Sequence, residues 1–214
     1  NGTGHAVAVA LDHLGNGGGQ TVLVAYGDMP LVSAEVYATL AGRPADVAVR
    51  MVTVDPGPDG FGRIIRDESG SVVGIVEERD STPDQLLISE RNAGLYAFDA
   101  EVLRTAVKEL QPDNAQGELY LTDVIGSIVA GGGRVETVPA GATEVIGVNS
   151  HGDLAAVQSH LRDRINAELL EAGVWMLDPA RTYIDATVTV AAGARIYPGT
   201  HLEGATTVGP GATV

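Results

Sequence analysis

The sequence contains no cysteine and a single lysine, Lys108, among its 214 residues. The absence of cysteine excludes disulfide bonds, thiolate metal sites and cysteine nucleophiles. The other twelve of the 13 basic residues are arginines, and aromatic residues make up only 4% of the chain. A chain without cysteine fits a reducing compartment, so we expect the protein to be cytoplasmic.

Long hydrophobic runs are also absent. No apolar segment approaches the roughly 20 residues that a membrane-spanning helix needs. The first residues, Asn1–His5, carry neither the basic flank nor the apolar centre of a signal peptide. The sequence therefore predicts a protein that neither spans a membrane nor is exported.

Positive charge is scarce, because 13 basic residues face 28 acidic ones and give a net charge of −15. Such a field repels nucleic acids and anionic membranes, so neither is expected as a partner. It also opposes the binding of a nucleoside triphosphate unless a metal ion or a local basic cluster intervenes. An enzyme acting on nucleotides would carry more cations near its phosphates, so the shortage suggests that a basic segment is missing.

The first part of the sequence alternates between predicted strands and a predicted helix. Residues 21–26 and 47–54 form short apolar runs, typical of strands buried on both faces of a parallel sheet. Ser33 lies where it would cap a helix over residues 34–41. Strand, helix and strand in this order predict an α/β sheet with a crossover helix.

Further elements follow along the chain. Two β-rich runs within residues 62–78 flank Asp67–Gly70 and predict a hairpin with a tight turn. Strands are also predicted over residues 93–98, 135–138 and 144–148, and helices near 100–110, over 119–130 and over 152–172. Leu154, Val157, Leu161, Ile165 and Leu169 give the last helix an apolar stripe.

The final segment carries a strict period of six. Branched apolar residues recur at every sixth position, and glycines at 193, 199 and 211 lie three residues after three of them. A hexapeptide period is the pattern of a parallel β-helix, in which each repeat is a short strand and a turn. The repeating residues are Ile184, Val190, Ile196, Leu202, Val208 and Val214.

Several polar residues lie at the ends of predicted strands. Asp28 follows the first strand, where open α/β sheets bind ligands, and its carboxylate either binds Mg²⁺ or caps a turn before Pro30. Asn149 either binds the metal through its amide oxygen or forms a turn that caps the next helix. Glu77 and Asn92 either bind sugar hydroxyls or are solvated loop residues.

Taken together, seven motifs in this order resemble the bacterial family of bifunctional N-acetylglucosamine-1-phosphate uridylyltransferase/glucosamine-1-phosphate acetyltransferases. The block Asn114–Asp123 and the Gly-Val-Asn end are the most specific, whereas Gly-Asp-Met-Pro-Leu is shared more widely among sugar nucleotidyltransferases. The resemblance covers essentially the whole chain. The motifs are Gly2–Ala6, Tyr26–Leu31, Phe61–Ile64, Ile75–Glu78, Asn92–Gly94, Asn114–Asp123 and Gly147–Asn149.

The resemblance implies an α/β fold with a Rossmann-like mixed sheet, followed by a linker helix and the start of a left-handed parallel β-helix. The implied domains are a nucleotidyltransferase domain over residues 1–150, the linker over 151–178, and the beginning of the acetyltransferase domain over 179–214. The complete protein would then be a homotrimer.

The resemblance also implies a role for each matched position. Gly2 and Thr3 would lie by the nucleotide base, and Tyr26 and Gly27 would line the cleft. Asp28 and Asn149 would bind Mg²⁺ together. The N-acetylglucosamine moiety would be held by Gly62, Glu77 and Asn92. The substrates would be UTP and N-acetylglucosamine 1-phosphate, with acetyl-CoA and glucosamine 1-phosphate at an acetyltransferase site that these residues do not include.

The family opens with a glycine-rich loop carrying Arg and Lys, and no such loop occurs here. We therefore expect this chain to be a fragment that is inactive alone, with its catalytic residues in the missing segment. Two alternatives stay open. One is a sugar-1-phosphate nucleotidyltransferase with a β-helix tail that uses another base or sugar, against which the Asn-Ala-Gln-Gly-Glu block argues. The other is a non-catalytic regulatory or assembly module, against which the retention of Asp28 and Asn149 argues.

Overall fold

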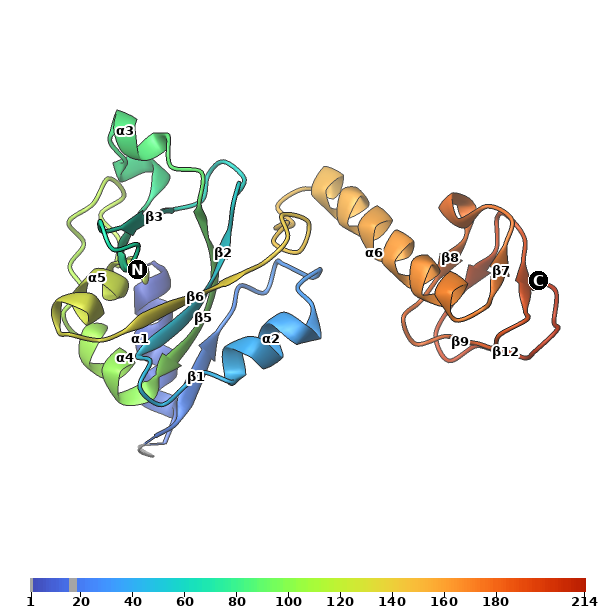
Figure 1. Ribbon diagram of the computed structural model, residues 1–214, viewed down its shortest axis with the longest axis horizontal. Coiled ribbons are helices and arrows are strands. Elements are labelled where there is room, and N and C mark those ends of the chain that lie inside the picture. The colour runs from blue at the N-terminus through green and yellow to red at the C-terminus, as the bar shows by residue number, and fades with distance from the viewer. Residues whose placement is uncertain (1, 16–18) are drawn as a thin grey trace. The chain divides into compact units, whose positions relative to one another are not determined.

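The computed structural model describes residues 2–15 and 19–214. The chain divides into two units, of which the first ends at Val145 and the second covers Ile146–Val214. Figure 1 shows a sheet flanked by helices in the first unit, and a long helix followed by short strands in the second. Each unit has a hydrophobic core of its own.

The first unit is built on one sheet of six strands. Five of them follow the order β4-β3-β5-β2-β6, and β1 pairs with β5 on the edge opposite β2. The pair β2–β6 is parallel and the other pairs are antiparallel, so the predicted mixed sheet is confirmed. The strands are β1 Thr21–Val24, β2 Val49–Val54, β3 Arg63–Arg66, β4 Val72–Val76, β5 Arg91–Asp99 and β6 Val135–Pro139.

Helices cover both faces of this sheet (Figure 1). Because side chains alternate along β5, Phe98 packs with Ile125 of α5 on one face, whereas Leu95 packs with Leu40 of α2 on the other. Helices α1 and α4 join α5 in the first of these cores. The helices are α1 Thr3–His13, α2 Ala34–Ala41, α3 Pro83–Leu86, α4 Ala100–Ala106 and α5 Asp123–Ala130, with a 3-10 turn, η1, at Glu78–Asp80.

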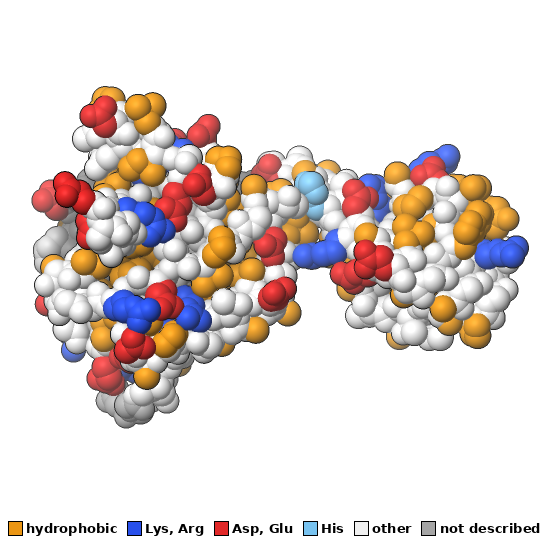
Figure 2. Space-filling view, viewed as in Figure 1, with side chains coloured by type: hydrophobic (Ala, Val, Ile, Leu, Met, Phe, Trp, Pro, Cys, Tyr) orange, Lys and Arg blue, Asp and Glu red, His pale blue; other side chains and the backbone are white. Residues whose placement is uncertain are grey.

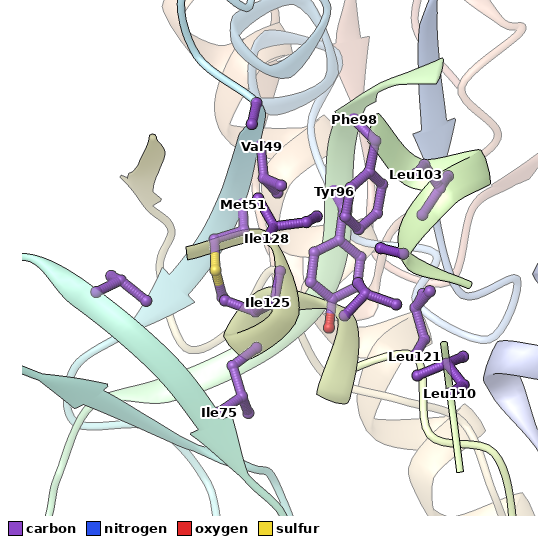
Figure 3. Close-up of a cluster of buried hydrophobic side chains, with 14 of the residues drawn as sticks. Val49, Met51, Ile75, Tyr96, Phe98, Leu103, Leu110, Leu121, Ile125 and Ile128 are labelled. Carbon is purple, nitrogen blue, oxygen red and sulfur yellow. The ribbon is translucent and has the colours of Figure 1, made fainter. Parts of the chain in front are cut away.

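Tyr96 occupies the centre of the larger core. Its ring stacks on Phe98 with the centroids 5.3 Å apart, and neither residue is exposed to solvent. Figure 3 shows the Tyr96 ring among apolar side chains that include Leu103 and Ile125, with its hydroxyl oxygen pointing away from Phe98. The buried Tyr96 hydroxyl therefore lies at the edge of this core.

Two local predictions are confirmed. The side chain of Ser33 accepts a hydrogen bond from the Val36 N–H and caps α2. In the hairpin of β3 and β4, the Asp67 carboxylate accepts hydrogen bonds from the N–H groups of Ser69 and Ser71 at 2.9 and 3.0 Å. The turn is completed by Gly70 at a φ of +84°, a conformation that side chains other than glycine rarely adopt.

Other predictions are wrong. The first strand was expected to be parallel and buried on both faces, but β1 is antiparallel to β5, and Leu23 is 44% exposed. Residues 144–148 form no strand. Here the Glu144 carboxylate accepts hydrogen bonds from the N–H groups of Ser33 and Gly141, which bends the chain into a turn. Helix α5 starts only at Asp123, four residues later than expected.

The second unit begins with a 21-residue helix, α6, and continues in two-residue strands. The strands form three parallel pairs, β7–β10, β8–β11 and β9–β12. In the last two pairs the partners lie 18 residues apart, as Tyr183 and His201 do, which is three hexapeptides. The elements are α6 His151–Glu171, β7 Trp175–Met176, η2 Pro179–Arg181, β8 Tyr183–Ile184, β9 Thr189–Val190, β10 Arg195–Ile196, β11 His201–Leu202 and β12 Thr207–Val208.

Helix α6 is attached to these strands by its C-terminal half. Ile165 and Leu169 pack against the core that contains the hexad residues, whereas Leu154 at the other end is 41% exposed. The buried Asn166 side chain donates hydrogen bonds to the carbonyls of Pro179 and Thr182 at 2.8 and 2.9 Å. Within the described ranges, no helix is long and apolar enough to cross a membrane.

Candidate functional site

The segment Tyr26–Asp28 directly follows β1 and is anchored by its tyrosine. The Tyr26 ring lies against Gly94 of β5 so closely that a Cβ at Gly94 would be 2.2 Å from the ring carbon Cε2. Gly27 and Asp28 are exposed. Within the described part of the chain, the Asp28 carboxylate accepts no hydrogen bond and forms no ion pair, so it is available to a ligand.

Glu77 lies at the end of β4 and is half-buried. Its Oε1 accepts a hydrogen bond of 2.8 Å from the Thr122 hydroxyl, and its Oε2 faces Gly62, where an added Cβ would lie 3.4 Å away. Burial raises the pKa of the Glu77 carboxyl, the Thr122 hydrogen bond lowers it, and the nearby Asp123 and Asp80 raise it. Two opposed effects therefore act on the charge of this carboxyl.

Asn92 is buried in β5, with only 5% of its surface exposed. Its Nδ2 donates a hydrogen bond of 2.7 Å to the Tyr96 hydroxyl, and its Oδ1 accepts one of 3.2 Å from the Gly94 N–H. Its backbone N–H donates to the Gly62 carbonyl at 2.9 Å. Gly62 therefore adjoins both Asn92 and Glu77, and the three predicted sugar-binding residues lie together.

Tyr26 belongs to the same neighbourhood. Burial raises the pKa of its phenol, and the carboxyls of Glu77 and then Asp28 raise it further. The structure thus brings Tyr26, Gly62, Glu77 and Asn92 to one region of the first unit, with Gly27 and Asp28 at its exposed border.

Gly2 and Thr3 contact the segment that contains Leu119 and Leu121. The Thr3 hydroxyl accepts a hydrogen bond of 3.0 Å from the Leu121 N–H. Gly2 has a φ of +108°, and a Cβ there would lie 2.7 Å from the Leu119 carbonyl oxygen, so only glycine fits. Thr3 also lines a mostly apolar cavity of about 360 Å³ between α1 and β1, and Tyr26 lies on the same cavity.

Asn149 belongs to the second unit and is exposed. It does not follow a strand as predicted, and the residue whose side chain caps α6 is Ser150. Asn149 contributes its backbone N–H to the Asp153 carboxylate at 3.1 Å. Its pairing with Asp28 at a metal stays a prediction. Residues 2–15 and 19–214 contain no group of three or more His, Asp or Glu side chains placed to hold a metal ion.

Three residues near Glu77 and Asn92 were not predicted as site residues. They are Thr122, Tyr96 and Tyr120, whose hydroxyl is buried and has no hydrogen-bond partner among the described residues. Thr122 and Tyr120 fall inside the specific Asn114–Asp123 motif, which was the signal available for them in the sequence. Tyr96 falls inside an apolar strand pattern and had none.

Most arginines of the first unit form ion pairs with acidic side chains. Arg50 pairs with Glu136 at 2.7 Å, and Arg66 pairs with Glu90 at 2.6 Å. Figure 2 shows blue side chains beside red ones on the visible face of this unit. The ion pairs of the first unit join Arg43 to Asp99, Arg50 to Glu136, Arg63 to Glu78, Arg66 to Glu90, and Arg134 to Asp46 and Glu136.

The sequence pattern of the nucleotidyl transferase family matches residues 1–176. The chain belongs to the nucleotidyl transferase family. The region around Glu77 and Asn92 thus lies within the part of the chain that carries the nucleotidyl transferase pattern.

Curated relatives of this nucleotidyl transferase are called bifunctional protein GlmU. Those of Streptomyces avermitilis and Mycolicibacterium vanbaalenii are 44% and 45% identical to it, over 100% and 97% of this chain and 45% and 43% of their own length. The chain therefore spans slightly less than half of these relatives. The resemblance inferred from the sequence motifs is confirmed.

A solved structure shares the fold. The nucleoside-diphosphate-sugar pyrophosphorylase of Vibrio cholerae RC9 gives a TM-score of 0.53 at 18% identity, over 73% of this chain and 64% of that one. At this identity the likeness concerns the nucleotidyl transferase fold alone.

Proposed function

We propose that this chain is part of an enzyme that transfers a uridylyl group from UTP to N-acetylglucosamine 1-phosphate, giving UDP-N-acetylglucosamine and pyrophosphate. The observation that carries the proposal is the group of Gly62, Glu77 and Asn92, in which a carboxylate and an amide adjoin a glycine too confined for a side chain. Carboxylates and amides are the groups that hydrogen-bond sugar hydroxyls and an acetamido group.

In this reaction a phosphate oxygen of the sugar 1-phosphate attacks the α-phosphorus of UTP. The bond from that phosphorus to the bridging oxygen of the β-phosphate breaks, and pyrophosphate leaves with the electron pair. Such a transfer depends on alignment and on neutralising charge, and it needs no protein nucleophile. Gly2 and Thr3 would border the nucleotide base, and Tyr26 and Gly27 would line the cleft between base and sugar.

Mg²⁺ is the cofactor that we assign. The free carboxylate of Asp28 fits a hard cation that prefers oxygen ligands, and the amide oxygen of Asn149 would complete the protein's share of the ligands. When bound, the ion neutralises the negative charge of the phosphates. This role agrees with the shortage of unpaired cations in the first unit.

The rest of the proposal concerns the complete protein. Residues 1–150 would belong to the nucleotidyltransferase domain, 151–178 to a linker helix, and 179–214 to the start of a left-handed β-helix. The 18-residue spacing of the paired strands supports the last assignment. The complete protein would also acetylate glucosamine 1-phosphate with acetyl-CoA, act in the cytoplasm and form a homotrimer. The product would supply cell-wall precursor synthesis.

The test replaces the proposed metal ligand in the full-length protein that carries these residues. Asp28→Asn keeps the shape of the side chain and removes its charge. We expect it to lower Mg²⁺-dependent formation of UDP-N-acetylglucosamine at least about 100-fold, because losing a metal contact costs several kcal/mol of transition-state stabilisation. The control is Asp12→Asn, which changes another exposed aspartate, on α1.

The outcomes separate the alternatives. Equal activity of the Asp28→Asn and Asp12→Asn variants would overturn the metal assignment. A wild-type protein that prefers glucose 1-phosphate or mannose 1-phosphate, or a triphosphate other than UTP, would support a nucleotidyltransferase of different specificity. No transfer with any of these substrates would support a non-catalytic module.

A further inference from the structure

Two buried hydroxyl groups lie directly behind the proposed sugar-binding side chains. Thr122 is 2% exposed and donates to Glu77 Oε1 at 2.8 Å. Tyr96 is fully buried and accepts from Asn92 Nδ2 at 2.7 Å. Each hydroxyl contacts one of the two polar groups that would touch the sugar.

The Thr122 hydroxyl does not cap the helix that follows it. Thr122 directly precedes α5 but has helical backbone angles, φ −60° and ψ −27°, whereas a residue that caps a helix through its side chain is extended. The N–H groups of Val124 and Ile125 donate to the carbonyls of Leu121 and Thr122, so α5 begins without a side-chain cap. The Thr122 hydroxyl instead donates to Glu77 across 45 positions of sequence, and helix capping does not explain its orientation.

Hydrogen bonds within the protein use only some of the donors and acceptors of Asn92 and Glu77. The Asn92 amide has two N–H donors, of which Tyr96 takes one, while the Gly94 N–H occupies the amide oxygen. The Glu77 carboxylate has one oxygen occupied by Thr122 and a second, Oε2, beside Gly62. The second N–H of Asn92 and the Oε2 oxygen of Glu77 therefore have no hydrogen-bond partner among the described residues, while Asn92 Oδ1 and Glu77 Oε1 each keep one further lone pair.

We propose that Thr122 and Tyr96 are positioning residues for sugar recognition: Thr122 holds Glu77 as a hydrogen-bond acceptor, and Tyr96 holds Asn92 as a hydrogen-bond donor. This inference rests on the proposed function of the same site. It adds that two residues that do not touch the sugar fix Asn92 as a hydrogen-bond donor and Glu77 as an acceptor. The sugar hydroxyls must match this arrangement.

The charge of Glu77 is part of this arrangement. Its carboxyl is faced by Asp80 and Asp123 and by the phenols of Tyr26, Tyr96 and Tyr120, and no cation among the described residues lowers its pKa. Burial and the two aspartates raise its pKa, and the Thr122 hydrogen bond is what opposes them. Removing the hydroxyl therefore favours the protonated carboxyl, which is a poorer acceptor for a sugar hydroxyl.

The experiment compares Thr122→Val, Thr122→Ser and Tyr96→Phe in the full-length protein. We expect Thr122→Val and Tyr96→Phe each to raise the KM for N-acetylglucosamine 1-phosphate about tenfold, with the KM for UTP unchanged, since each leaves a buried polar group without its partner. Thr122→Ser keeps the hydroxyl and should restore the wild-type KM. The controls are Thr105→Val on α4 and Tyr37→Phe on α2, whose hydroxyls form no hydrogen bond with Glu77 or Asn92 in the described part of the chain.

A second readout follows the charge of Glu77 directly. The acid limb of kcat/KM should move to higher pH in Thr122→Val, and so should the Glu77 carboxyl titration followed by ¹³C NMR on residues 1–214. A merely structural role would alter neither. The inference is overturned if Thr122→Val matches Thr105→Val in KM and leaves the Glu77 titration unchanged. A wild-type protein without uridylyl transfer would instead overturn the proposed function, and the sugar role of the two hydroxyls with it.

Discussion

The contact between Gly94 and Tyr26 leads to a prediction that needs no substrate. Gly94 has a φ of +73°, and a Cβ at this residue would lie 2.2 and 2.5 Å from two carbons of the Tyr26 ring. Replacing Gly94 by alanine therefore imposes two penalties. The left-handed backbone costs a non-glycine residue about 1–2 kcal/mol. The half-buried Tyr26 ring must also move, and overpacking of this kind costs about 1–3 kcal/mol.

The matched control separates these two penalties. Gly70 has a similar φ of +84°, but a Cβ there would meet no atom within 4 Å. Gly70→Ala should therefore cost only the backbone penalty, about 1–2 kcal/mol. Gly94→Ala should cost about 2–5 kcal/mol, which is the sum of both. The difference between the two variants isolates the contact with Tyr26.

Amide hydrogen exchange of β5 is the suitable assay. The single tryptophan, Trp175, lies in the second unit, so tryptophan fluorescence would report the wrong part of the chain. Slowly exchanging amides near Tyr96 report the opening free energy of the first core. In a Tyr26→Ala background the cost of Gly94→Ala should fall to that of Gly70→Ala. Equal costs of Gly94→Ala and Gly70→Ala in the wild-type background would show that the ring is not packed as described.

Three further predictions concern the proposed enzyme. Asn92→Ala in the full-length protein should weaken the use of N-acetylglucosamine 1-phosphate at least about tenfold more than UTP binding; an equal loss of UTP affinity by calorimetry would count against it. Residues 1–214 alone should not form UDP-N-acetylglucosamine at a useful rate, because Lys108 is the only lysine and the first unit pairs five arginines with carboxylates; chelator-sensitive transfer by this polypeptide would contradict it. Light scattering should find a trimer for the full-length protein and a monomer or weak association for residues 1–214, and the reverse result would refute both.

Sequence patterns predicted those parts of the fold that depend on near neighbours. The Ser33 cap of α2 and the Asp67 turn of the hairpin involve contacts across two to four positions, and both are present. The burial of β1 could not be predicted in this way, because it depends on which strands flank it. The turn at Glu144 was missed because its carboxylate bonds to Ser33, 111 positions away.

The residues of the candidate site also differ in how far the sequence could predict them. Glu77 and Asn92 stand in recognisable motifs, so they could be named in advance. Thr122 acts on Glu77 across 45 positions, and Tyr96 has the pattern of a core residue, which it also is. Glu77 and Asn92 were therefore named from motifs, whereas the hydrogen bonds by which Thr122 and Tyr96 hold these two side chains became evident only in the folded chain.

The open side of β1 has a consequence for handling the polypeptide. Within residues 2–15 and 19–214, β1 has a strand partner on one edge only, and Leu23 is 44% exposed. Backbone N–H and C=O groups along such an edge serve as a template for a strand from another molecule. In concentrated stocks of residues 1–214, self-association should therefore begin at β1, and a lysine in place of Leu23 should slow aggregation without disturbing either core.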